Sequence, residues 1–181
     1  MKKIIVFLTS LLLLTGCGNN KLLNTPTKKV EMFFGNYQSL DQDVIDQLND
    51  VANNEISFTD DQKETYVELM KKHYQALKYE IKDEVVDGDT ATVTVEIEVM
   101  DYSKILSEAN EYLENNKQEF NDENGNYDET LFNEYRLNKL KDAEETVKYT
   151  IDMTLTKIDG EWVLDDVSND VNDKIQGIYE Y

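Results

Sequence analysis

The strongest constraint on the fold is a segment of strict alternation between residues 90 and 100. Aliphatic residues occupy every second position there, and threonine or glutamate fills the positions between them; the aliphatic residues are Ala91, Val93, Val95, Ile97 and Val99. Successive side chains of a β-strand point to opposite faces of its sheet, so one face of this strand is buried and the other is polar. The segment therefore predicts a strand that other elements must cover on one side.

Two hairpins of similar design are expected. In the first, Tyr79, Ile81 and Val85 alternate with charged residues before the turn dipeptide Asp87-Gly88, and the strand described above follows. In the second, the alternating residues 147–155 precede an Asp-Gly turn at 159–160, and residues 161–167 return. Hairpins of this kind predict an antiparallel sheet.

Helical patterns surround these hairpins. Thr25, followed by the only proline of the chain, is a typical helix start, and Ser39 and Thr59 each have a glutamine three residues later, as in a capping box. Helical spacing returns in two stretches between residues 103 and 145, separated by a polar loop at 115–128, and again in the tail from residue 171. We therefore expect an α+β fold: N-terminal helices packed on a curved antiparallel sheet, with a helical insertion between the two hairpins.

The N-terminus has the pattern of a secretory signal. A basic head at residues 1–3 leads into an apolar run, residues 4–14, that is too short to span a bilayer, and Leu-Thr-Gly-Cys follows. These last four residues resemble the lipobox of bacterial lipoproteins. The resemblance implies cleavage between Gly16 and Cys17, diacylation of the Cys17 sulfur, and attachment to the extracytoplasmic face of the cell membrane. We expect a signal peptide at 1–16, a tether at 17–26 and a domain at 27–181.

Charge restricts the partners. The chain has a formal net charge of −20, which becomes −22 when Lys2 and Lys3 leave with the signal peptide. Such a body is repelled by nucleic acid and by anionic lipid headgroups, so the lipid on Cys17 must provide the membrane attachment. Cys17 is also the only cysteine, which excludes a disulfide within the chain. We expect no nucleic acid partner, whereas a cationic protein or peptide partner is compatible with the charge.

The order of elements resembles the NTF2-like (cystatin-like) superfamily. The resemblance depends on the N-terminal helical third, the Asp87-Gly88 hairpin and the Ile-Asp-Gly-Glu-Trp-Val-Leu turn at residues 158–164, which is similar to the Gly-x-Trp hairpin common in that superfamily. In particular, the chain looks like small lipoproteins of Gram-positive bacteria that carry such a domain. The excess of lysine over arginine is also typical of AT-rich genomes of this group. The resemblance implies a cone between helices and curved sheet, while the helical insertion is larger than the basic fold needs.

Few residues are candidates for a site. A possible pocket between helices and sheet would be lined by Tyr66, His73, Tyr74, Tyr79 and Tyr149, although aromatic residues at these spacings are more often core. His73 is the only histidine, and its helical core position favours packing over catalysis. One histidine without a free cysteine cannot form a usual zinc site, and the acidic loop around Gly125 does not fit an EF-hand register. We expect no metal and no cofactor.

Three functions remain open at this point. The first is a lipid-anchored, non-catalytic module that binds a protein or peptide through its acidic surface. The second is a small-molecule carrier that uses the cavity of an NTF2-like cone. The third is an enzyme centred on His73 with a nearby carboxylate, for which the sequence offers no marked nucleophile.

Overall fold

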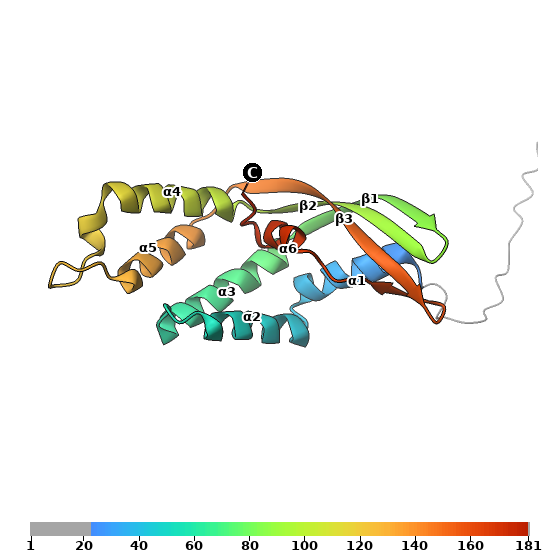
Figure 1. Cartoon of the computed structure of the whole chain (residues 1–181), viewed down its shortest axis with the longest axis horizontal. Helices are drawn as coiled ribbons and strands as arrows, with labels where there is room; N and C mark the ends of the chain where they lie inside the picture. Colours follow the sequence, from blue (N-terminus) through green and yellow to red (C-terminus); the bar gives the residue numbers. More distant parts are fainter. Residues whose placement is uncertain (1–22, 181) are drawn as a thin grey trace, which may run out of the picture.

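The computed structural model describes residues 23–180 and confirms the α+β class. The elements follow one another as α1 (Pro26–Ser39), α2 (Gln42–Asn54), α3 (Asp60–Ala76), β1 (Lys78–Asp87), β2 (Thr90–Met100), α4 (Tyr102–Asn115), the 3-10 helix η1 (Lys117–Phe120), α5 (Glu129–Lys141), β3 (Thr146–Ile158), β4 (Glu161–Leu164) and α6 (Asn169–Gln176). The strands form one antiparallel sheet in the order β1-β2-β3-β4. Helices α1, α3 and α6 lie on one side of this curved sheet, and α4 and α5 project together from one end of it (Figure 1).

The core lies between the sheet and the first helices. On β2, the expected inward residues Val93, Val95 and Ile97 have no exposed surface, and Val30 and Phe34 of α1 are equally enclosed. The opposite face of β2 and β3 is polar, and its carboxylates form exposed ion pairs such as the one between Glu96 Oε1 and Lys148 Nζ at 3.0 Å. Exposed pairs of this kind contribute little to stability, so burial of the aliphatic face stabilises the sheet.

A β-bulge changes the first strand. The pairing of β1 with β2 shifts by one residue between Ile81 and Asp83, which turns the later side chains to the opposite face. Val85 therefore pairs with Thr92 on the polar face and is 58% exposed. The expected inward position of Val85 is wrong. A bulge is defined by the pairing of two strands, so the alternation of residues within β1 alone does not reveal it.

The same bulge connects β1 to the first helix. Glu84 Oε2 accepts hydrogen bonds from the backbone nitrogen of Thr27 at 2.9 Å and from its hydroxyl at 2.6 Å. Thr27 lies in the first turn of α1, where backbone N–H groups lack helical partners and a negative charge is favourable. Glu84 thus fastens the start of α1 to the sheet.

Two of the three expected helix starts are confirmed. Thr25 caps α1, and both hydrogen bonds of the capping box at Thr59 are present in α3. The third is wrong, because Ser39 is the last residue of α1 and Asp41 caps α2 instead. Leu40 between them has a left-handed backbone conformation, with φ at 54°, which ends the first helix before the second begins.

The start of the described chain is attached to the second hairpin. The Asn24 amide nitrogen donates to the carbonyl oxygen of Gly160 at 2.9 Å, and its side-chain oxygen accepts from the backbone nitrogen of Trp162 at 2.8 Å. We refer to these two hydrogen bonds as the Asn24 link. The β3–β4 turn to which they attach lies at the opposite end of the molecule from the loop that joins α4 to α5 (Figure 1).

The helical insertion is present and has a small core of its own. Its buried residues are Ala109, Phe120 and Phe132, with Tyr112, Leu113 and Tyr135 packed against them. Phe120 is only 4% exposed although it belongs to the segment expected as a polar loop. That expectation is wrong for residues 117–120, since η1 folds there and places one aromatic ring between the two helices.

Candidate functional site

A cleft lies between α4 and α5. Its volume is about 560 Å³, within the range of ligand sites. Its base is formed by apolar and aromatic side chains, namely Ile105, Ala109, Tyr112, Tyr135 and Ala143, and its rim by charged side chains, namely Asp101, Lys104, Glu108, Lys139, Asp142, Glu144 and Glu145. We call this the α4–α5 cleft.

The rim of the cleft is predominantly acidic. Five carboxylates face two lysines, and one of these lysines is already paired, because Lys104 Nζ lies 2.8 and 2.7 Å from the two carboxylate oxygens of Glu145. This contact raises the pKa of Lys104. Asp101 also has a structural role, since it accepts the backbone N–H of Lys104 as the N-cap of α4. Glu108, Asp142 and Glu144 remain as the acidic groups best placed to meet an incoming cation.

Stacked tyrosines form the base. The rings of Tyr112 and Tyr135 lie 5.0 Å apart with an angle of 15° between their planes, and Lys139 Nζ lies 5.4 Å from the centre of the Tyr135 ring. The Tyr112 hydroxyl donates to Glu119 at 2.9 Å, and this hydrogen bond raises the pKa of Tyr112. An aromatic face attracts cations through its quadrupole, so the base and the rim favour the same kind of ligand.

The five expected pocket residues are not brought together around one cavity. Tyr66 and Tyr74 line a groove of about 160 Å³ between the first three helices and α6, and Tyr66 also lines a second cavity of about 310 Å³. Tyr79 stacks on Phe34 at 5.0 Å, and Tyr149 is buried on the inner face of β3, with its ring 5.9 Å from that of Tyr179. Burial and two neighbouring tyrosines raise the pKa of Tyr74 above its ordinary value. The fifth residue, His73, lies in the core.

His73 is enclosed, with 2% of its surface exposed. Its Nε2 lies 2.8 Å from the carbonyl oxygen of Ile175, and because a carbonyl only accepts, Nε2 carries the proton. Nδ1 is buried without a hydrogen-bond partner among residues 23–180, and the ring lies 4.7 Å from that of Tyr102. Burial lowers the pKa of His73. The ring therefore holds the C-terminal helix to α3 in its neutral form.

This environment predicts a pH-dependent stability. The folded protein binds the His73 proton more weakly than the unfolded chain, whose histidine titrates near pH 6.5, so stability is highest above that pH and falls below it. We expect urea denaturation to show a loss of up to about 1.4 kcal/mol per pH unit between about pH 6.5 and 5. The variant His73→Gln should lose this slope whatever its absolute stability. An unchanged slope in the variant would mean that another group is responsible.

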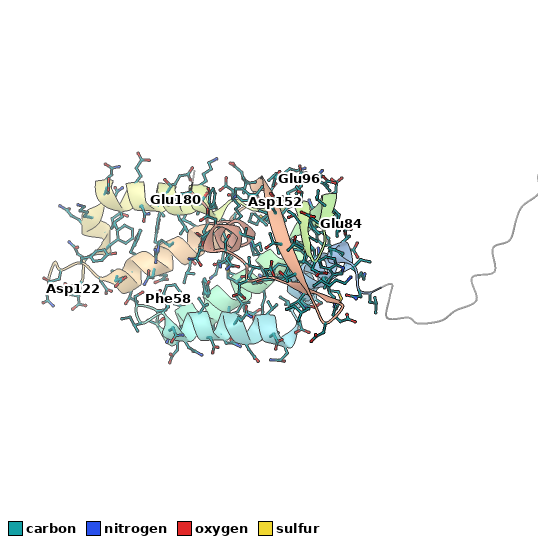
Figure 2. All side chains as sticks on the ribbon, turned by 45° about the vertical axis from the view of Figure 1, so that its right-hand side comes forward. Phe58, Glu84, Glu96, Asp122, Asp152 and Glu180 are labelled. Atoms are coloured by element: carbon teal, nitrogen blue, oxygen red, sulfur yellow. The ribbon has the colours of Figure 1, made fainter. Side chains whose placement is uncertain are left out.

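The acidic loop around Gly125 is closed by its own backbone. The Asp122 carboxylate accepts the backbone N–H groups of Asn126 at 2.8 Å and Asn124 at 2.9 Å, and these hydrogen bonds lower the pKa of Asp122. Figure 2 shows Asp122 at the tip of the helical insertion, away from the sheet. In the part of the chain that the structure describes, no group of three or more His, Cys, Asp or Glu side chains is arranged to hold a metal ion.

The sequence did not single out the residues of the α4–α5 cleft. Tyr112 and Tyr135 belong to different helices, and their stacking depends on how α4 and α5 face each other. The available signal was compositional, because residues 101–145 contain thirteen acidic and five basic side chains. A charge excess marks a segment as acidic but cannot indicate that two tyrosines lie beneath the charges.

Comparison with known proteins identifies only the N-terminal segment of the chain. Residues 1–17 match the family model of the prokaryotic membrane lipoprotein lipid attachment site. No curated protein and no solved structure matches the chain significantly. Within residues 23–180, no helix has both the length and the apolarity needed to cross a membrane. The predicted cleavage residues Gly16 and Cys17 lie outside the described residues, and the NTF2-like resemblance and the Gram-positive origin stay predictions. The chain thus carries a bacterial lipoprotein signal, which supports its attachment to a membrane through lipid on Cys17.

Proposed function

We propose that this protein is a lipid-anchored, non-catalytic binding module on the extracytoplasmic face of the cell membrane, and that its α4–α5 cleft receives a basic segment of a peptide or protein. The observation that carries the proposal is the combination of three available rim carboxylates, Glu108, Asp142 and Glu144, with the stacked rings of Tyr112 and Tyr135 beneath them. A lysine or arginine side chain can place its charge at the rim and its stem along the rings.

Long-range attraction supports the same kind of partner. The mature chain has an expected net charge of −22, and a field of this sign increases the rate at which cationic molecules reach the surface. Lys139 already lies over Tyr135, which indicates that this ring accepts a cation. The affinity should therefore fall as salt is added, because the rim is exposed to solvent.

The two alternative functions receive less support. The core location of His73 gives it no access to either the α4–α5 cleft or the groove at Tyr74, so an enzyme centred on it lacks a place for substrate. A carrier with its ligand inside an NTF2-like cone needs space on the inner face of the sheet. The inner side chains of β2 are fully enclosed there, and Phe34 of α1 packs against them.

The proposal is tested with a fluorescent decapeptide of alternating lysine and leucine and with the lipoprotein in phosphatidylcholine vesicles, whose neutral headgroups do not attract the peptide. Fluorescence anisotropy should show saturable binding that weakens with salt. The double variant Glu108→Lys and Glu144→Lys should bind at least about tenfold more weakly, since two favourable contacts of roughly 1 kcal/mol each become repulsive.

The matched control has the same change in net charge at a distance from the cleft. Asp50→Lys on α2 and Glu64→Lys on α3 alter exposed residues that do not line the α4–α5 cleft. This variant should lose less than about threefold in affinity at physiological salt, where distant charges are screened. Equal losses in the two variants would show that the peptide responds to overall charge and would remove the cleft from the proposal.

A further inference from the structure

A second cavity, of about 310 Å³, lies where α3, α4 and α5 meet the C-terminal segment. Most of its wall is apolar and comes from five separate parts of the chain: Phe58, Leu69, Met70, Leu106, Leu140 and Ile178. Two opposite charges, Glu55 and Arg136, also line it. An apolar cavity with few polar groups is the usual form of a small-molecule site, so the way in which these two charges are held decides what it could bind.

Contacts with neighbouring residues of α5 hold the guanidinium of Arg136 in place. Arg136 is the only arginine of the chain. Its Nη2 donates to the side-chain oxygen of Asn133 at 2.5 Å, and its Cζ lies 5.2 Å from the centre of the Phe132 ring. Asn133 has no exposed surface, and its amide nitrogen donates to Ser57 at the carbonyl oxygen, 3.2 Å, and at the hydroxyl, 3.1 Å. A buried amide thus sets the position of the guanidinium while consuming only one of its nitrogens.

The carboxylate is held by the same serine. Glu55 Oε1 accepts from the Ser57 hydroxyl at 2.8 Å and from its backbone nitrogen at 3.3 Å. These hydrogen bonds, assisted by the nearby Arg136 charge, lower the pKa of Glu55, so the group is ionised at neutral pH. A chain of hydrogen bonds therefore runs from Glu55 through Ser57 and Asn133 to Arg136. Each charge has its own structural partner, which leaves both able to meet a ligand.

From this arrangement we infer that the cavity binds a small zwitterion with an apolar body, namely an apolar amino acid or dipeptide with free termini. Glu55 receives the ammonium group, Arg136 receives the carboxylate through its planar fork, and the side chain lies among Phe58, Met70 and Leu106. The volume equals that of about ten water molecules, which suits a ligand of roughly ten to fifteen non-hydrogen atoms. This site is separate from the α4–α5 cleft and does not depend on the function proposed for that cleft.

Isothermal titration calorimetry of the full lipoprotein in phosphatidylcholine vesicles tests the inference with three sets of probes. The first set is leucine, phenylalanine and glycyl-leucine with free termini, for which saturable binding is expected. The second set has an acetylated amino group, and the third has an amidated carboxyl group. Each blocked set should bind at least about tenfold more weakly, because each lacks one charge that the cavity is arranged to meet.

Variants assign the two ends of the ligand. Arg136→Gln should no longer distinguish the free carboxylate from the amide, and Glu55→Gln should no longer distinguish the free amine from the acetylated form. Lys139→Gln, which neutralises one charge in the α4–α5 cleft, should bind all probes as the unmodified protein does, and so should the Glu108→Lys and Glu144→Lys double variant. If Arg136→Gln does not fold, Arg136→Lys keeps the charge and should lose affinity for free carboxylates because it lacks the fork.

Three results would overturn the inference. One is the absence of saturable binding of every free probe to the folded, unmodified lipoprotein. Another is equal affinity for free and blocked probes, which would indicate an apolar cavity without charge recognition. The last is retention of both kinds of discrimination in Glu55→Gln and Arg136→Gln, which would place the binding elsewhere.

Discussion

Replacement of Gly177 by alanine is expected to lower the free energy of unfolding by at least about 3 kcal/mol. Gly177 ends α6 with φ at +70°, a left-handed conformation that costs other residues about 1–2 kcal/mol. In addition, a Cβ at this position would lie 2.1 Å from the Met100 carbonyl oxygen and 3.2 Å from Cε1 of His73. The backbone at Gly177 or Met100 must shift to relieve the first contact. This shift would disturb the hydrogen bond that the backbone nitrogen of Ser103 donates to the Gly177 carbonyl oxygen.

Gly35 provides the matched control. It lies within α1, and a Cβ built there meets no atom within 4 Å. Gly35→Ala should therefore raise the free energy of unfolding by about 0.5–1 kcal/mol, because alanine loses less backbone freedom in a helix. Urea denaturation followed by circular dichroism measures both variants. A Gly177→Ala protein as stable as the unmodified one would show that α6 does not pack against the β2–α4 junction as described.

Replacement of Cys17 by alanine is expected to abolish lipid attachment. The match of residues 1–17 to a lipid attachment site indicates Cys17 as the expected acceptor of the lipid, and the chain has no second cysteine. Two acyl chains give stable membrane binding at about 0.8 kcal/mol for each buried methylene group, whereas one chain binds only marginally. Metabolic labelling with radioactive palmitate should mark the unmodified protein in the membrane fraction and leave Cys17→Ala unlabelled.

A neighbouring substitution controls for expression and export. Gly18→Ala follows the matched residues and leaves the cysteine in place, so it should be labelled like the unmodified protein. The Cys17→Ala chain should also migrate as the longer, uncleaved precursor. A lipobox is cut immediately before the cysteine that carries the lipid, and this variant has no such cysteine. Label on Cys17→Ala would show that another group carries the lipid.

Features specified by neighbouring residues were predictable from the sequence. The alternation on β2 and the caps at Thr25 and Thr59 depend on side chains within four residues of one another, so a one-dimensional pattern records them. His73 could be placed at a buried helical position for the same reason. The bulge after Ile81 could not, since it is defined by the pairing of β1 with β2.

The candidate sites depend on contacts between distant segments. Ser57 and Asn133 are 76 positions apart, and neither lies in a pattern that points to the other. The aromatic contact of Phe120 with Phe132 likewise depends on η1 folding back between α4 and α5. The sequence predicted a helical insertion at residues 103–145, but only packing in three dimensions creates the α4–α5 cleft and the cavity at Arg136.

The Asn24 link determines which end of the domain lies nearest to the expected lipid anchor. Asn24 lies seven positions after Cys17, so the point of attachment on the β3–β4 turn can lie at most about 25 Å from Cys17, the expected site of the lipid. Glu84 marks this end of the domain and Asp122 the other (Figure 2). We therefore expect a lipid on Cys17 to keep the β3–β4 turn near the bilayer, and the helical insertion at the opposite end of the domain to extend away from it, where it would meet approaching molecules before the rest of the domain does.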